Sequence, residues 1–92
     1  MTNQKPEPTA DELHALLDAV RDAIAIPYAA TIGDDETRAR ILADRVMHAC
    51  IALENVLDRD DEPGWTVEYL RARLAEHPPT GYRHWGETGA GR

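Results

Sequence analysis

DETRARILADRVMHACIALENVLD, residues 35–58, is the stretch that decides the fold. Apolar side chains recur in it every three or four residues, and neither Pro nor Gly interrupts it. This is the pattern of an amphipathic helix with one face in a core. We therefore expect a helix from about Asp35 to Asp58, with Asp34 as its cap. Its core stripe should consist of Ala39, Leu42, Val46, Ala49, Leu53, Val56 and Leu57.

A second helix is predicted on the N-terminal side. Thr9 and Glu12 have the spacing of a capping box, and Pro27 should end the helix near Ile26. Its apolar stripe follows the same periodicity and consists of Leu13, Leu16, Leu17, Val20 and Ile24.

A short third helix should follow the break at Pro63 and Gly64. Trp65 and Thr66 resemble a hydrophobic staple and a cap, and the helix should end near Glu76, before a pair of prolines. Its apolar residues are Val67, Leu70 and Leu74.

These elements predict an all-α fold: a small three-helix domain with an antiparallel helix pair, a short third helix laid across its end, and an aromatic C-terminal tail. We expect residues 1–8 to be a disordered lead, 9–85 a single helical domain, and 86–92 a flexible Gly-rich tail.

Composition excludes several classes of function. The chain has a net charge of −7 and a single lysine, so no basic stripe is available to neutralise phosphates, and we expect no direct nucleic-acid binding. It has no serine and one cysteine, so the usual nucleophiles are nearly absent and we expect no enzyme. One cysteine and no long apolar run or leader predict a cytoplasmic protein without a membrane segment.

The residues that could bind a metal or act as a nucleophile are few. Asp44 and His48 are spaced so that both could reach one metal ion, although a surface ion pair is the favoured interpretation. Cys50 lies at the edge of the core stripe and should be buried and unreactive. We therefore expect no metal, no cofactor and no catalytic residue.

The long helix carries a second apolar feature formed by Met47 and Ile51. Because these residues lie far around the helix from the core stripe, either the third helix and tail cover them or another chain does. We expect a protein partner, with homodimerisation through the long helix.

Two further segments could bind a partner. The tail from Tyr82 through Arg83 to Trp85 is either an anchor on the core or a docking peptide, because Tyr, Trp and Arg dominate binding hot spots. The acidic run is either a solvated loop or a patch that meets a basic partner. Its residues are Asp58, Asp60, Asp61 and Glu62.

The predicted function is therefore a non-catalytic protein–protein interaction module. The alternative is an acidic inhibitor that imitates nucleic acid and occupies the basic groove of a DNA- or RNA-binding protein. Surface arginines should interrupt the acidic row that such a mimic needs, and we count among them Arg38, Arg40, Arg45 and Arg59.

The stretches IPYAATIGD (26–34) and YLRARLAEHP (69–78) resemble small uncharacterised actinobacterial proteins, some of them carried by phages or other mobile elements. The resemblance covers residues 10–85 and includes no catalytic motif. It implies a helical, intracellular accessory protein of a mobile element, and it transfers no functional residue.

Overall fold

The computed structural model describes residues 7–85 and confirms an all-α fold of three helices. They are α1 (Ala10–Ile24), α2 (Ile32–Arg59) and α3 (Pro63–Glu76). The described residues contain no strand, only an isolated antiparallel bridge between Ala29 and His84. The predicted Gly-rich tail and most of the predicted N-terminal lead lie outside the described residues.

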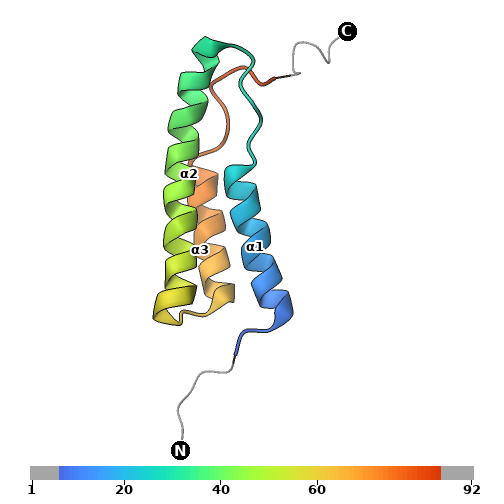
Figure 1. Cartoon of the computed structure of the whole chain (residues 1–92), viewed down its shortest axis with the longest axis vertical. Helices are drawn as coiled ribbons and strands as arrows, with labels where there is room; N and C mark the ends of the chain where they lie inside the picture. The colour runs from blue at the N-terminus through green and yellow to red at the C-terminus, as the bar shows by residue number, and fades with distance from the viewer. Residues whose placement is uncertain (1–6, 86–92) are drawn as a thin grey trace, which may run out of the picture.

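The three helices pack side by side (Figure 1). α1 and α3 run in one direction and α2 in the opposite direction, and α3 lies along both partners rather than across their end. The turn between α2 and α3 is three residues long, 60–62, and so short a connection returns the chain antiparallel to the helix it leaves. Within residues 7–85, no helix is long and apolar enough to cross a membrane.

Threonine side chains cap the first two helices. The predicted capping box is present: the Glu12 amide donates to Thr9 Oγ1 (3.1 Å), and the Thr9 amide donates to Glu12 Oε1 (2.9 Å). α2 begins three residues earlier than predicted because Thr31, not Asp34, is its cap. The Asp34 amide donates to Thr31 Oγ1 at 3.1 Å, so the Asp34 carboxylate lies in the first turn, beside the positive end of the helix dipole.

α3 also begins earlier than predicted, at Pro63. A proline suits the first helical position because an N–H there has no partner within the helix, so the N–H that proline lacks is not missed. Thr66 is fully buried inside the helix, and its hydroxyl donates to the Glu62 carbonyl at 3.0 Å. The prediction of Thr66 as a cap was therefore wrong. At the end of α2, Asp60 has a left-handed backbone (φ 58°), a common way to end a helix.

The core is built mainly from alanine. Its buried residues are Leu16, Ala19, Ala23, Ala49, Ala52, Leu70 and Leu74. Small side chains let helices approach closely, which leaves little room for larger ones on the line of contact. The predicted stripes were accordingly wrong at several large residues, which lie on the surface: Leu13, Leu17, Ile24, Val46 and Leu57.

Arg45 takes a core position, where we expected a surface charge. Only 6% of the residue is exposed. Its guanidinium donates hydrogen bonds to carbonyls at the C-terminal ends of two helices. Nε donates to Ala23 (2.8 Å) and Nη2 to Asp22 (2.9 Å) on α1, while Nη1 donates to Leu74 (3.3 Å) and His77 (2.7 Å) at the end of α3. The carbonyls of Ala23 and Asp22 lie in the last turn of α1. The Leu74 carbonyl, which also accepts the His77 amide (3.0 Å), lies in the last turn of α3, so one cation interacts with the negative ends of both helix dipoles.

The tail folds back on the connector between α1 and α2. The buried Tyr82 donates its hydroxyl to the Pro27 carbonyl at 2.7 Å, and the Ala30 amide donates to the Arg83 carbonyl at 2.8 Å. Both segments lie beside the first turns of α2, which extend beyond α1 and α3 (Figure 1). The tail therefore packs on the connector at the end of the bundle where α2 extends beyond the other two helices.

Candidate interaction surface

Among residues 7–85, two rows of apolar side chains on the bundle are wholly or partly exposed. The row on α1 consists of Leu13, Leu17, Val20 and Ile24, and the row on α2 consists of Val46, Cys50, Leu53 and Leu57. We call these eight residues the aliphatic face. Leu17 is 63% exposed and Leu57 is 74% exposed, whereas Val20 and Leu53 are half-buried against the core.

Both rows lie on the side of the bundle opposite α3. On α1, Asp22 contacts α3 by accepting a 2.6 Å hydrogen bond from Arg71, which also lies 3.5 Å from Asp18. On α2, His48 lies 3.5 Å from the Tyr69 hydroxyl. At roughly 100° per residue, Asp22 and His48 are each about half a turn from the apolar row on their own helix. The aliphatic face is therefore a surface of α1 and α2 alone.

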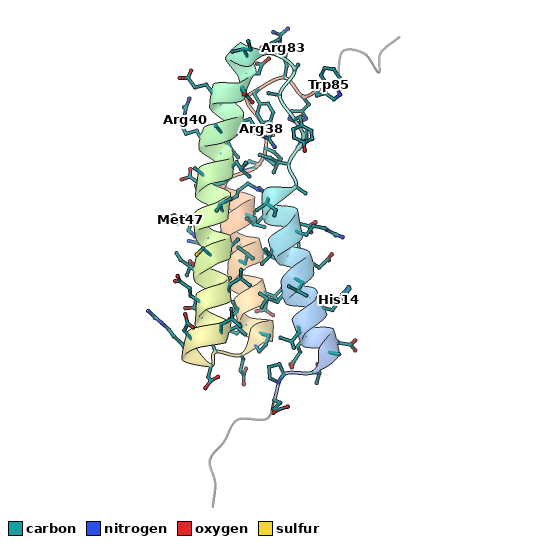
Figure 2. All side chains as sticks on the ribbon, viewed as in Figure 1. His14, Arg38, Arg40, Met47, Arg83 and Trp85 are labelled. Carbon is teal, nitrogen blue, oxygen red and sulfur yellow. The ribbon has the colours of Figure 1, made fainter. Side chains whose placement is uncertain are left out.

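The two outer edges of this face differ in charge. The α1 edge carries His14 and Arg21, and the α2 edge carries Glu54 and Asp58, all four exposed. Figure 2 shows His14 on the outer side of α1, and Met47 on the opposite outer side of α2. On the α1 edge Arg21 forms an ion pair with Asp18 (2.5 Å), whereas Glu54 and Asp58 make the α2 edge acidic toward the end of that helix.

Cys50 lies within the aliphatic face and is exposed, so the prediction of a buried thiol was wrong. Its Sγ is 3.7 Å from Glu54 Oε2, one turn further along α2. The alanine core explains the difference, since Ala49 and Ala52 occupy the contact line and turn Cys50 outward.

The second apolar surface predicted on α2, formed by Met47 and Ile51, has only one well-exposed residue. Met47 is 50% exposed, and Ile51 is half-buried. Met47 lies on the outer side of α2, away from α1 (Figure 2). It therefore extends the α2 edge of the aliphatic face and does not form a separate surface.

The predicted tail residues divide into two kinds. Tyr82 is an anchor, and its burial raises the pKa of its hydroxyl. Arg83 and Trp85 are exposed, and Arg83 Nε lies 3.3 Å from Asp34 Oδ2 at the start of α2. The Trp85 amide donates to the carbonyl of Tyr28, another exposed aromatic residue, at the tip of the bundle.

The predicted acidic residues lie at the opposite tip, where the chain turns from α2 into α3 (Figure 1). They are Asp58, Asp60, Asp61 and Glu62. The Asp61 amide donates to the Asn55 carbonyl at 2.9 Å, which closes the end of α2. The predicted partner-binding residues therefore lie in three separate places: the outer side of α2, the aromatic tip and the acidic turn.

Asp44 and His48 lie near a further histidine. Asp44 Oδ2 is 3.6 Å from His77 Nδ1, and the rings of His48 and His77 stack with centroids 5.6 Å apart. Across residues 7–85, no three His, Cys, Asp or Glu side chains form a group that could hold a metal ion. These residues instead join α2 to the end of α3.

No protein-family model, no curated protein and no solved structure matches this chain. The aliphatic face is therefore interpreted from the residues of this chain alone. Sequence reasoning missed it because the rows were assigned to the core. The signal that could have found it is the alanine spacing in both helices, with Ala19 and Ala23 in α1 and Ala49 and Ala52 in α2.

Proposed function

We propose that this protein is a non-catalytic protein–protein interaction module that forms a homodimer through α2. The observation that supports this is the aliphatic face, where two helices present large apolar side chains on the side away from α3. An exposed apolar patch with polar edges is typical of a surface that another protein covers.

The proposal of a non-catalytic role is supported by how the polar side chains are used. Arg45 binds helix ends, Tyr82 anchors the tail, and Asp22 and Arg71 join α1 to α3. Each of these groups has a structural partner. The aliphatic face itself offers apolar area rather than a set of converging polar groups, which suits binding better than chemistry.

We place the protein in the cytoplasm. Cys50 is a free thiol on the surface, and such a thiol keeps its reduced form most readily in a reducing compartment.

Light scattering on the purified chain tests the proposal. We expect the mass of a dimer for the wild type and of a monomer for the double variant Leu17→Glu/Leu57→Glu, because two new charges from each chain would have to be desolvated in the interface. Both residues are more than half exposed, so the variant should keep its helical circular dichroism. Ile32→Glu is the matched control, since Ile32 is 92% exposed but lies off the aliphatic face.

A wild type that stays monomeric at every concentration would refute the homodimer. Salt separates the proposal from the acidic-mimic alternative. Contact through the aliphatic face should persist as salt is raised, whereas a complex between an acidic mimic and a basic groove should weaken steeply.

A further inference from the structure

We propose that the aliphatic face binds a basic amphipathic helix of another protein, which lies along α1 and α2 as a fourth helix of the bundle. The apolar side of this helix covers the two rows, and its lysines or arginines lie toward the end of the bundle where α2 turns into α3. The inference rests on the proposed role as an interaction module and names the chemical class of the partner. Two observations support it: the shape of the face and the uneven charge along the bundle.

The two rows form one surface of the length that a helix covers. α1 and α2 are antiparallel, and the first turn of α1 lies level with the last turn of α2 (Figure 1). Each row spans roughly 17 Å, or about three turns at 1.5 Å per residue. On the opposite side, the 14 residues of α3 pack against the same two helices. A partner helix of similar length therefore matches the aliphatic face.

Charge is distributed unevenly along the bundle. Residues 7–17 and 50–69 make up the half that ends in the turn from α2 to α3 (Figure 1), and they contain nine acidic side chains and one arginine. We call this the acidic half. Residues 18–49 and 70–85, the other half of the described chain, contain seven acidic side chains and seven arginines. The formal charge of the described side chains is therefore −8 in the acidic half and zero in the other.

The carboxylates of the two halves also differ in how they are balanced. In the other half, arginines form ion pairs with Asp18, Asp22, Asp34 and Glu76. In the acidic half, a single arginine cannot balance nine carboxylates. Two of these, Glu54 and Asp58, are exposed beside the α2 row of the aliphatic face. The apolar face is therefore bordered by uncompensated negative charge at one end.

A basic amphipathic helix complements both properties, because it brings apolar area to the rows and opposite charge to the acidic half. A second copy of this chain brings the apolar area but also an acidic half of its own. The two occupants would cover the same residues and exclude each other. We therefore expect a basic helix to displace the second copy of the proposed homodimer.

A synthetic helical peptide tests the inference. The probe is a fluorescein-labelled peptide of about 18 residues, long enough to span the rows, with leucine on one side and lysine on the other. Fluorescence anisotropy measures its binding to the full chain at physiological salt. We expect the lysine peptide to bind at least about tenfold more tightly than the same peptide with glutamate in place of lysine.

Two pairs of variants locate the binding site. Glu54→Gln/Asp58→Asn should weaken binding by about fivefold, whereas Asp35→Asn/Glu36→Gln should have little effect. Both changes remove two exposed carboxylates, but Asp35 and Glu36 lie in the other half. Leu17→Gln/Leu57→Gln should weaken binding by about tenfold or more, because it removes apolar area from the face. Its control is Ile32→Gln, and circular dichroism checks that all variants are folded.

The results separate the inference from the proposed homodimer. Binding that is weakened by both face variants and by neither control supports the inference. Absence of binding, or binding that Leu17→Gln/Leu57→Gln leaves unchanged, overturns it, because the peptide then does not use the aliphatic face. Light scattering without peptide judges the homodimer independently. A dimer that binds no peptide keeps the homodimer and overturns the inference, whereas a monomer that binds the peptide on this face does the reverse.

Discussion

Arg45 Nε donates a 2.8 Å hydrogen bond to the carbonyl of Ala23, so a side chain from the middle of α2 closes the end of α1. The same guanidinium reaches the end of α3 through Leu74 and His77. Burial lowers the pKa of Arg45 from its ordinary value, while the Asp22 carboxylate and Tyr82 oppose that shift. An arginine stays charged even so, and its planar guanidinium can donate hydrogen bonds to several carbonyls at once.

Arg45→Met should destabilise the fold by about 2–4 kcal/mol, because helix-end carbonyls lose their donors and the apolar side chain replaces only the packing. Arg45→Lys should recover part of the loss, since an ammonium keeps the charge but not the fork. Urea denaturation followed by circular dichroism measures both. Arg40→Met is the control on the exposed side of the same helix and should change stability by less than about 0.5 kcal/mol. Equal effects at Arg40 and Arg45 would contradict the role of Arg45.

Tyr82→Phe should cost about 1 kcal/mol, because it removes the 2.7 Å hydrogen bond to the Pro27 carbonyl but keeps the buried ring. Thermal unfolding measures the change. Tyr28→Phe is the matched control, since Tyr28 is 70% exposed and its ring contact with Arg38 does not need the hydroxyl. If Tyr82→Phe leaves stability unchanged, the tail is not anchored as described.

Asp22→Asn should destabilise the protein at neutral pH and make no difference in strong acid. The hydrogen bond from Arg71 is the main cause that holds the pKa of Asp22 below its ordinary value of 3.8, with burial acting in the opposite direction. The folded state therefore favours the carboxylate, and this stabilisation is present above the unfolded pKa and lost as pH falls through the folded one.

Denaturation of wild type and Asp22→Asn between pH 7 and pH 2 tests this expectation, with the two curves converging below about pH 4. Glu68→Gln, at an exposed position of α3, serves as the control, and its stability should follow that of the wild type across the pH range. A gap that widens in acid would mean that the sign of the linkage is wrong.

Ala52→Leu should destabilise the bundle by about 1–3 kcal/mol, because Ala52 is fully buried where the helices approach closely and a larger side chain forces them apart. Ala43→Leu places the same change on the exposed side of α2 and should be nearly neutral. Denaturant midpoints compare the two. A stable Ala52→Leu variant would show that the core has space the structure does not indicate.

Helix positions were predictable because periodicity, caps and prolines are local signals. Thr9 capped α1 as its spacing with Glu12 predicted, and the three helices lie where their apolar residues recur. The start of α2 was predicted three residues too late and that of α3 four residues too late, because Asp34 and Thr66 are as well suited to helix starts as the Thr31 and Pro63 that begin the helices.

The buried face could not be chosen from apolar periodicity alone, because periodicity does not say which of two adjacent stripes faces the core. Leu17 and Val46 are more apolar than Ala19 and Ala52, so ranking residues by hydrophobicity favours side chains that the structure leaves exposed. Arg45 was misplaced for a related reason. Its burial depends on carbonyls at the ends of two other helices, which become neighbours only in the folded chain.

In α1 and α2, the residues that pack in the core and the residues that form the outer apolar surface are different sets. On α1 and α2, small side chains such as Ala19 and Ala52 are buried in the core, while several larger aliphatic side chains, among them Leu17 and Leu57, are exposed. Substitutions at exposed residues such as Leu17 and Leu57 should therefore change the outer surface of α1 and α2 while leaving the alanine contacts of the core in place.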